Sequence, residues 1–144
     1  MTEMETILIF ILMGYLIGSF PSGLVYTRLA GMEDIRNLGS GNIGATNVGR
    51  VLGKKYGLIC FFLDVLKGAV PVLVVGMVSS VFGQSIEDTG TTDMLLWISV
   101  ALASLLGHMY SVFLKFGGGK GVATTFGGMV AERTAFIFPC VIDI

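Results

Sequence analysis

Long runs of apolar residues without charge constrain this chain more than any other feature. Residues 6–27 include no charged residue, and a helix of that length spans hydrocarbon about 30 Å thick at about 1.5 Å per residue. Of the 144 residues, 53% are hydrophobic and 13% charged, whereas a soluble domain carries about 25% charged residues. The pattern predicts an all-α, polytopic transmembrane helix bundle that forms a single membrane domain over residues 1–144.

About four spans are expected from the hydropathy pattern. Asp64 and Lys67 interrupt the second span, and Glu132 and Arg133 interrupt the last, which has the weakest signal. Pro21 lies near the end of the first run and is expected to kink or end that helix. The spans are expected at about residues 6–27, 56–78, 94–114 and 122–142.

The charges between the spans predict how the chain crosses the membrane. The connections at about 28–55 and 115–121 are basic, whereas the one at about 79–93 has acids and no base. Because basic connections stay on the cytoplasmic side, the connections at 28–55 and 115–121 are expected in the cytoplasm. The connection at 79–93 and the N-terminus are expected outside. The N-terminus carries acids where a secretory signal carries bases.

Two glycine-rich stretches are expected on this same cytoplasmic side, at residues 40–50 and 115–124. In the second, Gly118 and Gly119 let the backbone approach an anion closely, and Lys120 supplies a point charge. In the first, Arg50 offers bidentate contacts to a phosphate. Each stretch alone is equally compatible with a plain turn. Together they predict a site for a phosphate-bearing ligand.

Other residues allow two readings each. Asp64 and Lys67 lie three apart on one helix face, so the pair either fixes helix packing or serves a site inside the bundle. His108 is the only histidine, and it either bridges helices or touches a substrate. Cys60 and Cys140 lie in apolar runs, which favours plain buried side chains. A net charge of −1 gives no reason to expect nucleic-acid binding.

No catalytic triad, paired-carboxylate or metal-ligand spacing is apparent, so no metal and no cofactor are expected. An enzyme of this composition would work by positioning and electrostatic stabilisation. The second stretch is also not a nucleotide-binding P-loop, because Leu occupies position 114 and Gly121 follows Lys120.

Three motifs together resemble the bacterial acyl-phosphate:glycerol-3-phosphate acyltransferases, small integral membrane enzymes of phospholipid synthesis. These motifs are S-G-N-I-G-A-T-N-V-G-R at 40–50, D-V-L-K-G at 64–68, and G-H followed by F-L-K-F-G-G-G-K-G-V-A-T between 107 and 124. The resemblance implies a multi-pass protein of the bacterial inner or plasma membrane. It also implies an upstream enzyme that forms the acyl phosphate.

The resemblance implies a reaction as well. The primary hydroxyl of glycerol 3-phosphate would attack the carbonyl of an acyl phosphate, giving 1-acyl-glycerol 3-phosphate and phosphate, with substrate phosphate helping to take the hydroxyl proton. The acyl chain would lie among the helices, next to membrane lipid. By the resemblance, substrate would be bound by Ser40, Asn42, Thr46, Asn47, Arg50 and Lys120, to which the loop pattern adds Gly118 and Gly119. Candidate catalytic residues are Arg50, Lys120, Ser40 and His108.

The sequence departs from the family pattern at three points. Ser111 replaces a usual proline, and Gly117 replaces a common lysine, which predicts weaker phosphate binding. Members also continue into further spans and a third motif, so this chain is expected to be C-terminally truncated relative to the family. The alternatives are an inactive fragment of the acyltransferase, a small phosphate or anion transporter, and a structural subunit.

Overall fold

The computed structural model describes residues 3–79 and 89–142, with side chains described over 4–79 and 89–134. Within these ranges all regular structure is helical, which confirms the expected all-α bundle. The α-helices are α1 (Glu3–Ser19), α2 (Ser22–Leu29), α3 (Ala45–Leu52), α4 (Lys54–Val78), α5 (Thr91–Met109) and α6 (Val122–Ile142), and the 3-10 helices are η1 (Ile35–Asn37) and η2 (Val112–Leu114).

Three stretches of the described chain are long and apolar enough to cross a membrane: Met4–Leu29, Lys54–Val78 and Thr91–Leu114. Many large apolar side chains on them face outward, as those of a membrane protein do toward lipid. The fourth expected span forms helix α6, but its passage through the membrane and the limits of all four spans stay predictions. Most of the expected external connection at 79–93, and the side chain of Cys140, lie outside the described residues.

A break at Pro21 divides the first stretch into two helices. α1 ends at Ser19 and α2 begins at Ser22, with Pro21 at the N-cap of α2. Because proline has no backbone N–H and its ring clashes with the preceding turn, it ends the first helix as expected. At the break the Phe20 carbonyl accepts from the Ser22 N–H at 2.9 Å and from the Lys67 ammonium of α4 at 3.1 Å.

Glycines allow the long helices to approach each other closely. A Cβ at Gly18 of α1 would overlap the Ser104 backbone of α5, and one at Gly68 of α4 would overlap the Thr124 backbone of α6. Gly127 of α6 packs in the same way on the Val65 backbone. Contacts of this kind are typical of packed membrane helices, where small residues bring backbones together.

Helix α3 lies within the connection expected at 28–55. Val48 of α3 is completely buried in an apolar cluster with Ile35 and Cys60, and Gly49 packs on Gly57 of α4. Glycine and asparagine give this segment low helix propensity, so packing against α4 rather than propensity stabilises the helix.

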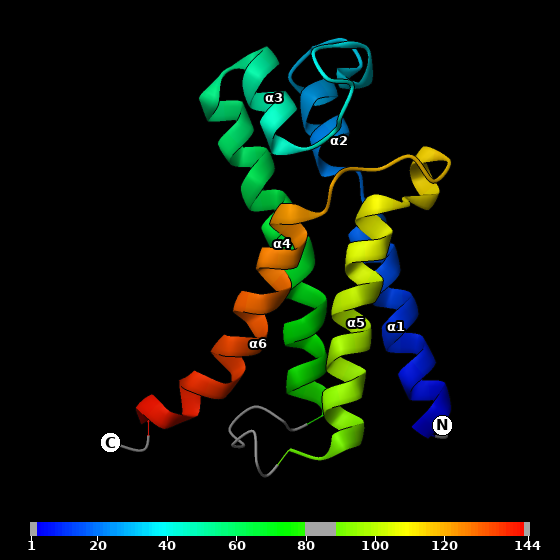
Figure 1. The fold of residues 1–144 in the computed structure, drawn as a ribbon, viewed down its shortest axis with the longest axis vertical. Coiled ribbons are helices and arrows are strands. Elements are labelled where there is room, and N and C mark those ends of the chain that lie inside the picture. Colours follow the sequence, from blue (N-terminus) through cyan, green and yellow to red (C-terminus); the bar gives the residue numbers. More distant parts are fainter. Residues whose placement is uncertain (1–2, 80–88, 143–144) are drawn as a thin grey trace.

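The two glycine-rich stretches lie at the same end of the bundle, opposite the N-terminus (Figure 1). α2, η1 and α3 form a cap at this end, and the segment between α5 and α6 crosses the end of the bundle beside that cap. The bundle therefore brings together two loops that are about 70 residues apart in the sequence.

Candidate functional site

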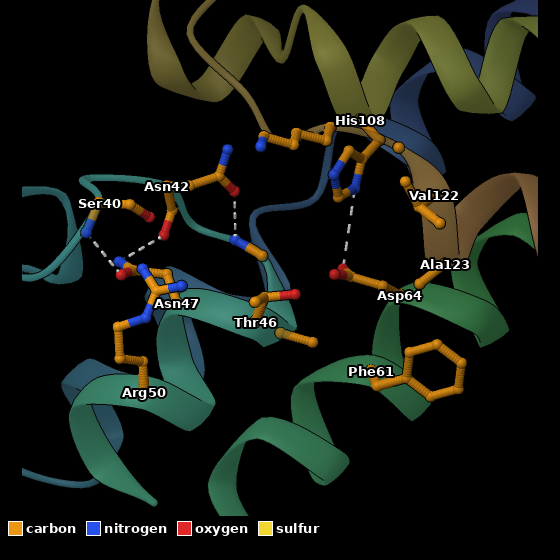
Figure 2. Close-up of a pocket in the computed structure, with 14 residues that line it drawn as sticks. Ser40, Asn42, Thr46, Asn47, Arg50, Phe61, Asp64, His108, Val122 and Ala123 are labelled. Carbon is orange, nitrogen blue, oxygen red and sulfur yellow. Dashed lines mark hydrogen bonds and ion pairs between the residues drawn. The ribbon is translucent and has the colours of Figure 1, made fainter. Parts of the chain in front are cut away.

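A cavity of about 250 Å³ opens where the two loops meet (Figure 2). It is large enough for several water molecules, at about 30 Å³ each, and so for a small phosphorylated polyol. Residues from both loops, α4 and α5 line it: Ser40, Asn42, Gly44, Ala45, Thr46, Asn47, Arg50, Phe61, Asp64, His108, Lys120, Gly121, Val122 and Ala123.

Asn47 organises the first loop, which is the glycine-rich stretch at residues 40–50. Its side-chain oxygen accepts from the Ser40 N–H at 2.8 Å, and its amide nitrogen donates to the carbonyls of Leu38 at 3.0 Å, Asn42 at 2.9 Å and Ile35 at 3.4 Å. Asn47 has 1% of its surface exposed, and its side chain forms its hydrogen bonds with the loop backbone. In this state it shapes the cavity wall from within.

Two helix N-termini border the cavity. α3 begins at Ala45 after Gly44, whose N–H donates to the Asn42 side chain at 2.8 Å, and α6 begins at Val122 after Gly121. The first N–H groups of a helix have no partner within the helix, and its dipole makes that end positive. The sequence predicts the α6 terminus but gives no sign of the α3 terminus.

The arginines and Lys120 at this end of the molecule fall into two groups. Arg28 and Arg36 pair with Asp34, at 3.2 Å and 2.6 Å, away from the cavity. The hydrogen bonds from Arg36 hold the pKa of Asp34 well below its usual range, and the same contact raises the pKa of Arg36. Arg50 and Lys120 line the cavity, and within the described part of the chain no carboxylate pairs with either. They are the cations in the cavity lining that are available to an anionic ligand.

The inner end of the cavity has a different chemistry. Asp64 and His108, both 3% exposed, meet there with the His108 Nδ1 3.8 Å from the Asp64 Oδ1 (Figure 2). The same oxygen accepts from the Ser22 hydroxyl at 2.6 Å and lies 3.0 Å from the Lys67 ammonium. The cavity thus has a cationic mouth and a carboxylate–imidazole floor.

The glycine loop, which is the second glycine-rich stretch at residues 115–124, differs from the expectation that the backbone of its glycines faces an anion. The Gly117 N–H donates to the Leu114 carbonyl at 3.1 Å, and the Gly119 N–H donates to the His108 carbonyl at 3.0 Å. Gly118 packs against the backbone of His108 and Met109. Gly118 and Gly119 lie outside the cavity lining, so in this structure they attach the loop to the end of α5 and place Lys120.

The structure therefore brings together seven of the nine residues that the sequence predicts: Ser40, Asn42, Thr46, Asn47, Arg50, His108 and Lys120. Whether they bind substrate stays a prediction. Phe61 lines the cavity without having been expected there, and Asp64 lines it although it was expected only as half of an ion pair with two open readings. The signal for Asp64 was a carboxylate inside a span, which is costly unless it faces the bundle interior.

Comparisons with known proteins point in one direction. The sequence matches the family described as glycerol-3-phosphate acyltransferase over residues 8–143. It is 52% identical over 124 residues to the glycerol-3-phosphate acyltransferase of Syntrophotalea carbinolica, a match that covers 86% of this chain and 58% of that protein. The chain therefore spans less than two thirds of the length of this relative.

The fold is similar to two crystal structures of PlsY, an integral membrane glycerol 3-phosphate acyltransferase. The glycerol 3-phosphate form is 43% identical, with 92% of this chain and 61% of that chain covered. The lysophosphatidic acid form is 41% identical, with 92% and 60% covered. The TM-score is 0.73 in both cases.

Proposed function

The chain belongs to the glycerol-3-phosphate acyltransferase family, and from that premise we propose that it transfers an acyl group from an acyl phosphate to the primary hydroxyl of glycerol 3-phosphate. The products would be 1-acyl-glycerol 3-phosphate and inorganic phosphate. The relatives' names support the acceptor, and the glycerol 3-phosphate form of the similar structure supports it further. The acyl-phosphate donor comes from the motif resemblance.

One observation carries the proposal: a single cavity combines Arg50, Lys120 and two helix N-termini at its mouth with Asp64 and His108 at its floor. The mouth suits phosphate, since guanidinium, ammonium and free N–H groups all favour a dianion. The floor suits hydroxyl groups, which can donate to a carboxylate and either donate to or accept from an imidazole.

This arrangement supports catalysis by positioning and charge. An acyl phosphate is already activated, so the attacking hydroxyl needs orientation more than a strong base. Arg50 and Lys120 would stabilise the charge that develops on the leaving phosphate. The new ester C–O bond forms as the bond between the carbonyl carbon and the phosphate oxygen breaks, and the hydroxyl proton passes to phosphate.

An apolar groove between α5 and α6 is a candidate binding site for the acyl chain. It has a volume of about 210 Å³ and is lined mainly by apolar residues, among them Ile98, Leu102, Leu105 and Met129. It also includes Thr124, whose hydroxyl lies 3.2 Å from the His108 ring. The groove therefore reaches the wall of the cavity in which the carbonyl would react.

The proposal is tested by reconstituting the chain in lipid with acyl phosphate and labelled glycerol 3-phosphate. We expect 1-acyl-glycerol 3-phosphate from the parent chain, and loss of product from Arg50→Ala and Lys120→Ala. The matched controls are Lys54→Ala and Lys115→Ala, which remove exposed cations outside the cavity. Equal losses in all four variants would contradict the site. Phosphate flux across the membrane without product would favour the transporter alternative.

A further inference from the structure

His108 presents its two ring nitrogens to different surroundings. Nδ1 faces the protein interior, 3.2 Å from the Thr124 hydroxyl and 3.8 Å from the Asp64 Oδ1. The opposite edge of the ring, with Nε2, lies against Gly119, and His108 lines the cavity. The two ring nitrogens therefore have different neighbours, a carboxylate and a hydroxyl on the Nδ1 side and Gly119 on the Nε2 side.

The carboxylate beside Nδ1 is held from several directions. The Ser22 hydroxyl of α2 donates to Asp64 Oδ1 at 2.6 Å, and the Lys67 ammonium lies 3.0 Å from the same oxygen. Lys67 is itself held by the Phe20 carbonyl at 3.1 Å. Because Ser22 of α2 and Lys67 of α4 both hold this carboxylate, its position relative to the imidazole is set by the fold.

Glycine at position 119 lets the loop approach Nε2 closely. A Cβ there would overlap Nε2 and its neighbouring ring carbons. The Gly119 N–H meanwhile donates to the His108 carbonyl at 3.0 Å, which holds the loop against the ring. The loop can therefore pass this close to the imidazole only because residue 119 has no side chain.

These contacts select one form of the ring. In a neutral imidazole one nitrogen donates and the other accepts, and the partner of one decides the role of the other. The negative charge of Asp64, 3.8 Å away, electrostatically favours a proton on Nδ1, which the Thr124 hydroxyl at 3.2 Å can accept, and this leaves the lone pair on Nε2. We propose that Asp64 and Thr124 are positioning residues that hold His108 in this tautomer, so that Nε2 accepts a hydrogen bond from the attacking hydroxyl of the polyol phosphate.

The inference rests on the proposed function for the identity of the ligand and adds a way to orient it. With the phosphate at Arg50 and Lys120, a hydroxyl bound to Nε2 points its oxygen lone pairs toward the acyl carbonyl. His108 keeps its own proton throughout, and the hydroxyl proton leaves with the departing phosphate. Asp64 acts only through the imidazole.

A single histidine makes the tautomer directly measurable. ¹⁵N-histidine labelling of the whole chain in lipid gives one pair of ring nitrogen resonances, assigned to His108. We expect a protonated Nδ1 and an unprotonated Nε2 in the parent chain. Asp64→Asn retains size and an acceptor oxygen for Ser22, and it should shift the population toward the other tautomer. A protonated Nε2 in the parent, or no change in Asp64→Asn, would overturn the inference.

Thr124→Val is a second variant that leaves the ion pair intact, and it should shift the tautomer population in the same direction by less. Gly119→Ala tests the Nε2 side: the added methyl group should displace the ring and perturb Nε2 more than Nδ1. If Gly119→Ala leaves both resonances in place, the geometry proposed for Nε2 is wrong.

Ligand titration separates this inference from the proposed function. Glycerol 3-phosphate should shift the Nε2 resonance, whereas inorganic phosphate, which has no polyol, should shift it much less. Equal shifts from both would overturn the hydroxyl contact. These readouts need no turnover, so a chain that fails to form product can still confirm the tautomer. In an active chain, Asp64→Asn should lower kcat by about 10- to 100-fold with little change in KM, as misplacement of a reacting group does. A change in KM alone would contradict the positioning role.

Discussion

Asn47 differs from the other polar residues of its loop in what its side chain contacts. Its amide bonds to backbone groups on both sides of the turn, from Ile35 to Asn42, whereas Asn42 makes one side-chain bond, to the Gly44 N–H. Two asparagines five residues apart therefore have different roles, one inside the loop and one at its surface. The family pattern places both at the phosphate site, and burial separates them.

Replacing Asn47 by Ala should destabilise the whole loop, because several of its hydrogen bonds depend on this one side chain. Three short hydrogen bonds are lost and buried backbone groups are left without partners, which should lower the free energy of unfolding by about 2–4 kcal/mol. Thermal unfolding in detergent measures the loss. Asn42→Ala is the matched control, and it should cost about 1 kcal/mol. Similar values for both variants would show that Asn47 does not organise the loop.

Gly117 can be replaced without strain. The nearest atom to an added Cβ is the Leu114 carbonyl oxygen at 3.4 Å, an ordinary contact, and its φ is not positive. Gly117→Lys adds a cation to the glycine loop, so glycerol 3-phosphate should bind about 3- to 10-fold more tightly at low salt, with the gain shrinking as salt rises. Calorimetry on Gly117→Lys and on the uncharged Gly117→Gln distinguishes charge from length. The same affinity in both would contradict a role for charge.

Asp34 should make the cap sensitive to acid. Hydrogen bonds from Arg36 depress the pKa of its carboxylate in the folded state, so its contribution to stability is present above the unfolded pKa of about 4. That contribution is lost as the pH falls through the lower folded value. Asp34→Asn should therefore flatten the fall in melting temperature below about pH 4. Glu33→Gln is the control, and an equal flattening there would contradict the assignment.

At the scale of the element, two adjacent glycines of α6 differ in how closely they pack against neighbouring helices. Gly127 and Gly128 are adjacent, but a Cβ at Gly127 would overlap the Val65 backbone of α4, whereas one at Gly128 meets the Ala101 methyl group at 3.7 Å. Gly127→Ala should lower the free energy of unfolding by about 1–3 kcal/mol, since the helices must separate. Gly128→Ala should have little effect. Equal melting temperatures for the two variants would show that α4 and α6 do not pack in this way.

Hydropathy predicts the long helices because an uncharged run must be buried in lipid or protein wherever it lies. It does not predict α3, which depends on Val48 and Gly49 finding partners on η1 and α4. The motif residues that line the cavity are predictable from the sequence, because the three motifs follow one another along the chain in the order typical of the family. The roles of Asp64 and Gly119 are not, because each depends on a contact with His108 from a distant part of the sequence.

At the scale of the whole molecule, the fold gathers the cavity-lining cations at one end of the bundle, and the charge pattern predicts which side of the membrane that end faces. Cysteines placed at Lys55 and Lys115 lie at the end with the cavity, and one at Thr92 lies at the start of α5, at the opposite end (Figure 1).

The orientation is tested in a background in which Cys60 and Cys140 are replaced by Ala. An impermeant thiol reagent applied from outside the cell should label the cysteine at position 92 and leave those at 55 and 115 unlabelled until the membrane is opened. This follows because basic connections stay in the cytoplasm. External labelling at 55 and 115 would place the cavity outside. A soluble phosphorylated substrate made in the cytoplasm could then reach it only after crossing the membrane, which would contradict the proposed acyl transfer.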